Sequence, residues 1–255
     1  MLSKFLKYES RALWRTLMPL MIAAVSCGTA AGLINRWMLA VSVERPVFSL
    51  TLFSVYSIAM AAVYVLCIIG IGLILYRYYR SVFTDEGYLT MVIPTEPSGI
   101  FSCKLLAGGL WALIVLAVLG VSLFLASLPM IISALIHGGV PAIDTFLPDL
   151  TESGVNEVLY IVDRAVNAVM TWILLYTAVN LGSVCFRRQK LFGALLFILL
   201  LWLAKTVIES LVSAFIPAGV AGNIYYIGEI LFAAAVGVGL YFLSVRLLST
   251  RFNIE

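Results

Sequence analysis

The side chains that usually bind metals or perform catalysis are few in this chain, and they are not grouped in useful patterns. The sequence has one histidine, His137, and four cysteines without a CxxC or Cys/His spacing. Zinc sites and disulfide frameworks depend on such spacings, so we expect neither. The ATP-binding motif GxxxxGK[ST] is also absent from the sequence. We therefore expect no catalytic, metal-binding or cofactor-binding residue, and any ATP and Mg²⁺ that drive the protein would bind to a separate polypeptide.

Charged residues interrupt the long apolar stretches at Lys205, Glu209 and Glu229, and Arg36 lies near the far end of the first stretch. Lys205 and Glu209 are four residues apart, which puts them on one face of a helix. Either charge alone at the bilayer centre would cost roughly 3 kcal/mol or more, and pairing lowers that cost. The pair is either a polar lining of a translocation path or subunit contact, or a neutralised structural pair near the outer interface. Glu229 lies either at the depth of Glu209 or at the level of the lipid headgroups.

The composition identifies the solvent of these residues as lipid. Of the 255 residues, 63% are hydrophobic and only 11% are charged, and the mean hydropathy is +1.09. Soluble proteins have about 25% charged residues. A single soluble core could not absorb so much apolar surface, which excludes a soluble enzyme, a disordered regulator and a disulfide scaffold. The net charge of +3 is too small to indicate nucleic-acid binding.

Six stretches are apolar enough, and approach or exceed the length of about 20 residues, to cross a bilayer as helices. They cover approximately residues 17–40, 48–76, 105–130 (or on to 136), 165–186, 191–216 and 227–245. An open sheet cannot satisfy its backbone in lipid, and these stretches lack the alternation of a β-barrel. We therefore predict an all-α polytopic membrane protein with six transmembrane helices. No histidine and no aspartate falls within these predicted spans, so an intramembrane enzyme is the least favoured function.

Lysine and arginine are concentrated in the N-terminal segment, the C-terminal tail and every second connection between the spans. Positive residues mark the cytoplasmic side of a membrane. We therefore expect both termini to be cytoplasmic and a loop of about residues 137–164 to be extracellular. A cleaved signal peptide is the competing interpretation of the first 35 residues, but their apolar run is as long as a full span.

Residues 1–16 predict an amphipathic helix that lies in the membrane interface, before a six-helix transmembrane domain over residues 17–255. The basic residues of this segment form one stripe on a helical wheel, and its leucines lie roughly opposite. The stripe consists of Lys4, Lys7, Arg11 and Arg15. These cations would face anionic lipid. Glu9 interrupts the apolar side, and it faces either a protein partner or neighbouring cation, or the headgroups.

Small residues recur every four positions on the first predicted span, at Ala24, Gly28 and Gly32. Small residues at this spacing let two helices approach closely. We favour packing within the chain over a seam between two copies of it.

The connection over residues 81–98, between the second and third predicted spans, combines acids with aromatic residues. It contains Thr84, Asp85, Glu86, Gly87, Tyr88 and Leu89. The threonine suits a helix N-cap, the two acids suit a first helical turn, and two prolines further on would end the helix. The sequence therefore predicts a short cytoplasmic helix. Its tyrosine and leucine favour burial against a partner over an ordinary lipid-facing loop.

Four short runs carry a resemblance to a known family. They are Lys7-Tyr8-Glu9, Leu17-Met18-Pro19-Leu20, Phe83 to Leu89, and Ile93-Pro94. These runs and the layout of the whole chain resemble bacterial ABC transporter permeases of the type 2 exporter class. The resemblance implies that the short helix is a coupling helix, whose residues Thr84 to Leu89 dock on a separate ATPase. One departure is that the connection between the fifth and sixth spans, about residues 217–226, is short, whereas members of the family often carry a re-entrant element there.

The resemblance implies a permease subunit in the bacterial cell membrane that couples ATP hydrolysis on a partner to the export of a hydrophobic or amphiphilic substrate. Such a substrate would be a peptide, a lipid or a drug. The resemblance also implies two ATPase subunits and a second permease subunit, identical or homologous. The alternative is a secondary transporter or a substrate-capture subunit that ATP does not drive. That alternative needs inward-facing ionisable residues, and Lys205, Glu209 and Glu229 are the candidates.

Overall fold

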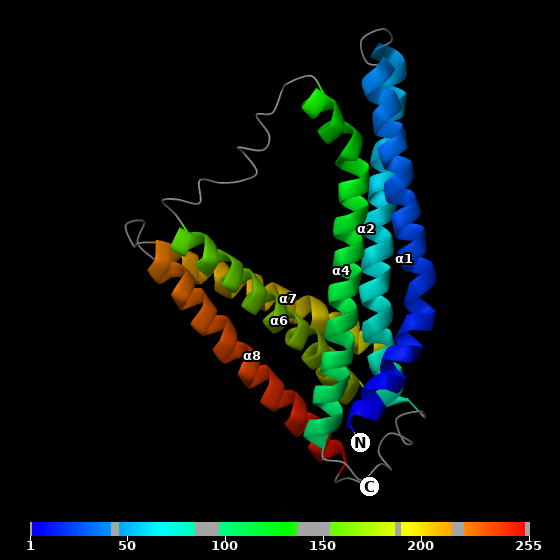
Figure 1. Ribbon diagram of the computed structural model, residues 1–255. Helices are drawn as coiled ribbons and strands as arrows, with labels where there is room; N and C mark the ends of the chain where they lie inside the picture. The colour runs from blue at the N-terminus through cyan, green and yellow to red at the C-terminus, as the bar shows by residue number, and fades with distance from the viewer. Residues whose placement is uncertain are drawn as a thin grey trace. The chain divides into compact units, whose positions relative to one another are not determined.

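The computed structural model describes residues 2–41, 46–84, 97–136, 154–186, 190–215 and 222–252. These ranges are almost entirely helical (Figure 1). The helices are α1 (Leu2–Val41), α2 (Pro46–Phe83), α4 (Pro97–Ile136), α6 (Gly154–Cys185), α7 (Lys190–Phe215) and α8 (Gly222–Phe252). The prediction of an all-α fold is therefore confirmed.

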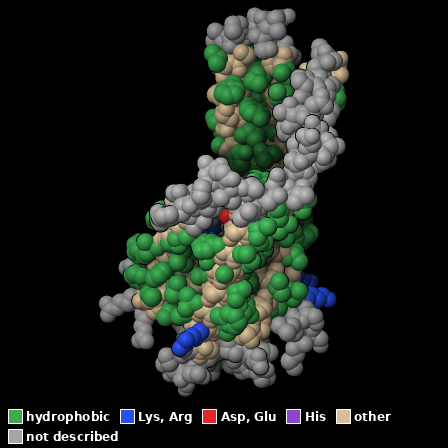
Figure 2. Space-filling model, turned by 90° about the vertical axis from the view of Figure 1, so that its left-hand side faces the viewer, with side chains coloured by type: hydrophobic (Ala, Val, Ile, Leu, Met, Phe, Trp, Pro, Cys, Tyr) green, Lys and Arg blue, Asp and Glu red, His purple; other side chains and the backbone are tan. Residues whose placement is uncertain are grey.

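Five of these helices are long and apolar enough to cross a bilayer. The candidate spans are Leu6–Leu39, Phe48–Phe83, Ser98–Ser133, Val158–Cys185 and Tyr225–Ser249. In α7 the corresponding apolar segment is shorter, Phe192–Ile208, so the fifth predicted span, about residues 191–216, stays a prediction. On the face seen in Figure 2, hydrophobic side chains cover most of the described surface. Helices of this kind indicate a multi-pass membrane protein.

Most helices extend beyond the predicted spans, and the extension of α6 changes one prediction. This helix begins at Gly154, whereas the predicted span begins at residue 165. Asp163 therefore lies inside a candidate span, and the prediction that no aspartate falls within the spans is wrong. The predicted spans ended at charged residues, but a carboxylate can lie in such a helix when other helices bury it. The end of the predicted outer loop, from Gly154 to Arg164, is helical for the same reason.

Helix α1 continues without a break through the predicted boundary at residues 16 and 17, and Pro19 lies inside it. Arg11 and Arg15 are exposed, whereas Leu13 and Leu17 are buried. The amphipathic character of the whole segment 1–16 stays a prediction. The position of residues 1–16 in the membrane interface stays a prediction.

The chain divides into two compact units, one made of residues 1–76 and 106–148 and the other of residues 77–105 and 149–255. The first unit contains α1, most of α2 and most of α4. Its helices pack closely because small residues line the contact of α1 with α4. A methyl group added at Gly28 would lie 2.7 Å from the backbone oxygen of Ser122. This confirms that the small residues of α1 pack within the chain.

The second unit is organised around α6, with both α7 and α8 packed against it (Figure 1). At Gly182 and Gly193 the contact of α6 with α7 is very close. A methyl group at Gly182 would lie 2.3 Å from the backbone nitrogen of Ala194, and one at Gly193 would lie 2.6 Å from the backbone oxygen of Gly182. The two backbones therefore touch, with no side chain between them.

This contact predicts the effect of one methyl group. Gly182→Ala should lower the free energy of unfolding by about 1–3 kcal/mol, because the added carbon meets backbone that cannot move aside. The measurement is unfolding of the purified protein by sodium dodecyl sulfate, followed by circular dichroism. Gly239→Ala is the matched control, because nothing lies within 4 Å of the added carbon. Equal midpoints for the two variants would contradict the close crossing.

Candidate functional site

The predicted coupling segment lies mostly outside the described residues. Five of its six predicted contact residues, Asp85 to Leu89, belong to this part, and their role stays a prediction. Thr84 is described and forms a bend directly after α2. Its Oγ1 donates a hydrogen bond to the backbone oxygen of Arg80 at 2.5 Å. The threonine side chain thus provides a hydrogen bond to a backbone oxygen in the last turn of α2.

The helix ends that border residues 85–96 are held by an aromatic cluster of Tyr78, Phe83, Phe101 and Tyr176. Phe83 is 4% exposed and Phe101 is fully buried. Both rings meet Tyr78 edge to face, with centroids 6.4 and 6.5 Å away. Tyr78 also packs on Tyr176 of α6, with ring centroids 4.3 Å apart. The end of α2 and the start of α4 are therefore fixed to each other and to α6.

Hydrogen bonds reinforce the aromatic cluster, one at its buried centre and one beside it. The Tyr78 hydroxyl donates to Oδ1 of Asn180 at 2.7 Å, which ties α2 to α6. The Trp172 Nε1 donates to the backbone oxygen of Leu105 at 3.3 Å, which ties α6 to α4. A buried hydrogen bond of this kind stabilises a fold, and a buried group that loses its partner destabilises it more strongly. These bonds therefore make the contact specific as well as tight.

Lys104 is the one lysine among the buried residues that the structure describes. Its Nζ donates to Oγ of Ser81 at 2.6 Å and so links α4 to α2. Its backbone oxygen accepts a bond of 3.4 Å from the Tyr176 hydroxyl. On the other side of α4, the hydroxyls of Ser102 and Tyr241 lie 2.8 Å apart, which connects this helix to α8. The helices α2, α4, α6 and α8 thus meet where α2 ends and α4 begins, on either side of residues 85–96.

The polar face of α6 continues towards α8. The Ser244 hydroxyl donates to Oγ1 of Thr177 at 2.9 Å. Oγ1 of Thr177 donates to the backbone oxygen of Ile173 at 2.8 Å. Asn180 Nδ2 is buried and has no hydrogen-bond partner among the described residues. This polar face was not predicted from the sequence, because its hydroxyl and amide groups carry no charge and lie among apolar residues.

The structure places two of the three predicted intramembrane residues, Lys205 and Glu229, against polar side chains. Lys205 Nζ donates to Oγ1 of Thr171 on α6 at 2.8 Å. The side chain of Glu209 lies outside the described residues, so its pairing with Lys205 stays a prediction. Glu229 lies near the start of α8, and its Oε1 accepts a hydrogen bond from the Tyr225 hydroxyl. Lys205 therefore contacts α6 rather than standing alone on α7.

Asp163 is the intramembrane residue that the sequence analysis missed. It is fully buried, and Nδ2 of Asn167 donates to its Oδ1 at 2.9 Å. Its Oδ2 has no hydrogen-bond partner among the described residues. Asp163, Asn167 and Thr171 form a polar track along α6. Lys205 of α7 contacts this track at Thr171. The spacing of Asp163, Asn167 and Thr171, four residues apart, was the signal that could have found it.

Other chemistry finds little support in the described part of the chain. No group of three or more histidine, cysteine, aspartate or glutamate side chains could hold a metal ion there. The four cysteines, at positions 27, 67, 103 and 185, are free thiols. Among the described residues, the polar track and the aromatic cluster contain no paired nucleophile and base.

Comparisons with protein families, with curated proteins and with solved structures found no match to this chain.

The buried contact between α2 and α6 predicts a specific energetic coupling. Tyr78→Phe should lower the free energy of unfolding by about 1–3 kcal/mol, because Oδ1 of Asn180 loses its donor in a dry site. Asn180→Leu should lower the free energy of unfolding much less in the Tyr78→Phe variant than in the wild-type protein, since the two residues act as a unit. A double-mutant cycle of unfolding in detergent measures this coupling.

Tyr64→Phe is the control for that cycle, because Tyr64 lies on the same helix and is half exposed. It should leave stability unchanged. Strictly additive effects of Tyr78→Phe and Asn180→Leu would show that the hydrogen bond contributes nothing.

Proposed function

We propose that this chain is the membrane-spanning permease subunit of an ABC exporter, driven by ATP hydrolysis on separate ATPase subunits. The proposal combines the resemblance of the segment from Phe83 to Leu89 with the geometry of the helix ends that carry it. The exported substrate would be hydrophobic or amphiphilic, because the helices that would enclose its path are mostly apolar. The assembly would contain two ATPase subunits and a second permease subunit, identical or homologous to this one.

The observation that carries the proposal is the fixation of both ends of residues 85–96 to α6. A coupling segment can act only if its displacement is transmitted to the membrane-spanning helices, which requires that the helix ends on both sides of it are firmly packed. Here Phe83 and Phe101 flank the segment and are both buried against Tyr78. A displacement of the segment would therefore move α2, α4 and α6 together. The packed aromatic rings resist compression, because protein interiors are dense.

The mechanism follows from this rigidity. ATP binding would bring two ATPase subunits together and shift the segment that docks on them. The Lys104 to Ser81 bond would keep α2 and α4 in step, and the Ser102 to Tyr241 contact would pass the movement to α8. The spans would then expose the substrate path to one side of the membrane or to the other. This chain would contribute no step of the hydrolysis itself.

The orientation of the chain is part of the proposal. Both termini and the segment 85–96 would be cytoplasmic, because lysine and arginine gather near them. The membrane would be a bacterial cell membrane, as the resemblance implies. The exposed Arg11 and Arg15 would then face the anionic inner leaflet.

The polar track favours a second candidate, a transporter driven by an ion gradient. Asp163 lies within a candidate span, and one of its carboxylate oxygens lacks a hydrogen-bond partner among the described residues. Ionisable residues inside a membrane often belong to ion or proton pathways. We rank this candidate second, because the polar track accounts for neither the acidic and aromatic segment nor the fixation of its ends.

The docking role of the segment is tested with two substitutions. Glu86→Arg reverses a charge, and Leu89→Asp puts a charge on the predicted contact surface. Both should prevent co-purification of an ATPase subunit bearing GxxxxGK[ST], and should abolish stimulation of its ATP hydrolysis. Arg246→Glu, an exposed charge reversal near the same expected side, should leave both unchanged. Intact assembly and stimulated hydrolysis in both segment variants would refute the coupling role.

The two candidate functions are separated by one substitution in the polar track. Asp163→Asn keeps the shape of the side chain and the possibility of a bond with Asn167. An ATP-driven exporter should retain its ATP-dependent transport in proteoliposomes within about twofold, because the energy enters elsewhere. A gradient-driven transporter should lose its uptake or efflux and should run without any ATPase. Loss of gradient-driven transport in this variant, with ATP having no effect, would establish the second candidate.

A further inference from the structure

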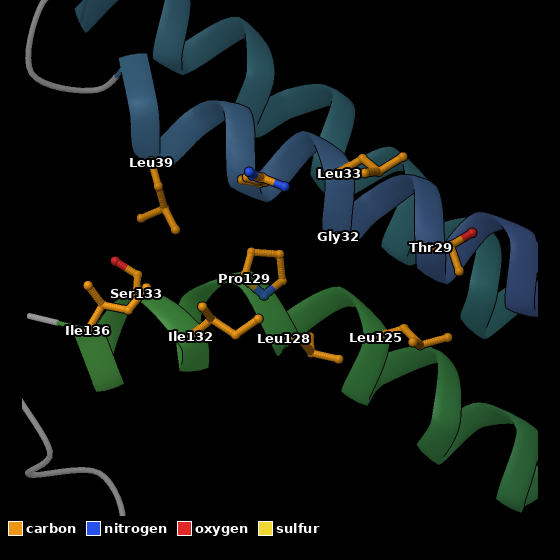
Figure 3. A pocket seen from close by; sticks show the side chains of 11 residues that line it. Thr29, Gly32, Leu33, Leu39, Leu125, Leu128, Pro129, Ile132, Ser133 and Ile136 are labelled. Carbon is orange, nitrogen blue, oxygen red and sulfur yellow. The ribbon is translucent and has the colours of Figure 1, made fainter.

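A pocket of about 690 Å³ lies between α1 and α4 in the first unit (Figure 3). Its volume is in the range of small-molecule binding sites. Most of its eleven lining residues are aliphatic. They include Leu33 and Leu39 from α1 and Leu125, Leu128, Ile132 and Ile136 from α4. In Figure 3, the side chains of Leu39 and Pro129 point from their own helices towards the opposite helix.

The two helices are held together along the floor of this pocket. A methyl group at Gly32 would lie 2.5 Å from the backbone oxygen of Leu125, so the backbones touch there. Nδ2 of Asn35 donates to the backbone oxygen of Ala126 at 3.2 Å. Pro129 has no N–H, which frees the backbone oxygen of Leu125 from the usual helical bond. The pocket is therefore a feature of a fixed helix pair rather than a gap between loose elements.

One lining residue is charged. Arg36 is exposed, and no described residue forms an ion pair with it. Glu9 is the only acid in the described part of this unit, and it lies on the same continuous helix. A helix rises about 1.5 Å per residue, so the two lie about 40 Å apart along α1. Within the described part of the unit, the guanidinium thus lacks an anion.

The position of Arg36 corresponds to the headgroup level of a bilayer. It lies near the end of the candidate span Leu6–Leu39, about 8 Å from the end of α1. Its neighbour Trp37 is 65% exposed, and tryptophan is enriched at membrane interfaces. The opposite end of the pocket, at Thr29, lies about 10 Å deeper along the helix. A cation at the headgroup level with an aliphatic wall below it matches the shape and charge of a phospholipid in one leaflet.

We propose that this pocket binds an anionic phospholipid of the surrounding bilayer. The lipid phosphate accepts hydrogen bonds from Arg36, and one acyl chain follows the aliphatic wall towards Thr29. Lipid has direct access, because Leu33 and Ile136 on the rim are 63% and 73% exposed and lie on helices whose solvent is the membrane. Arginine suits this role, since its planar fork of donors matches a phosphate. The proposal stands independently of the exporter assignment.

Native mass spectrometry of the purified full-length protein tests the proposal. The probes are dioleoyl phosphatidylglycerol and dioleoyl phosphatidylcholine, titrated separately. The wild-type protein should bind the anionic lipid more tightly, and Arg36→Gln should weaken that binding about fivefold, with little effect on the zwitterionic lipid. Arg36→Lys should retain most of the preference. Thr29→Phe should weaken binding of both lipids, because it fills the tail end of the pocket and replaces an exposed residue.

Arg164→Gln is the matched control, because Arg164 is exposed and lies in the other unit, where it covers the Tyr160 ring at a distance of 4.9 Å. It should leave lipid binding unchanged. An equal loss of binding in Arg164→Gln would overturn the proposal in favour of a diffuse charge effect. An unchanged preference in Arg36→Gln would also overturn it. So would a co-purified anionic compound other than phospholipid that phosphatidylglycerol fails to displace, since the pocket would then hold a transported substrate.

Discussion

Lipid offers no hydrogen-bond partners, so a polar side chain on a membrane-spanning helix must bond to its own helix or to another one. Both solutions occur in this protein. On α2, the hydroxyls of Thr51, Ser54 and Ser57 donate to backbone oxygens three or four residues earlier. On α6, Asn180, Thr177 and Thr171 accept hydrogen bonds from other helices. Helix α6 is thus the element to which the second unit owes its arrangement.

The second requirement is steric, since association of helices in lipid depends on close packing rather than on the hydrophobic effect. The protein meets it with glycine at Gly28 and Gly32 in one unit and at Gly182 and Gly193 in the other. Cross-helix hydrogen bonds add to these close contacts, and short side chains such as Ser244 and Thr177 bond directly between α8 and α6. Both units therefore combine a tight contact with a few directed bonds.

The sequence predicts those parts of the fold that depend on properties averaged over many residues. Composition and apolar runs predict an all-α membrane protein, and the four-residue spacing of Ala24, Gly28 and Gly32 predicts close packing within the chain. Helix ends are harder, because charge was used to delimit the spans, and Asp163 lies inside α6. The polar track depends on the neighbours of α6 in space. Lys205 was found from its charge, but its contact with Thr171 on another helix was not predictable from a four-residue spacing on α7.

Gly182 lies near one end of α6, only a few residues before Cys185, and there the helix touches the backbone of α7. Because a crossing without intervening side chains permits little sliding, a tilt of α6 relative to α7 would be centred there, with Gly182 as its pivot. Asp163 lies nineteen residues away on the same rigid rod, which corresponds to about 28 Å. A tilt of about 5° at the pivot would carry the buried carboxylate through about 2.5 Å. Small rotations of α6 about Gly182 would thereby become atomic-scale displacements of the Asp163 carboxyl group.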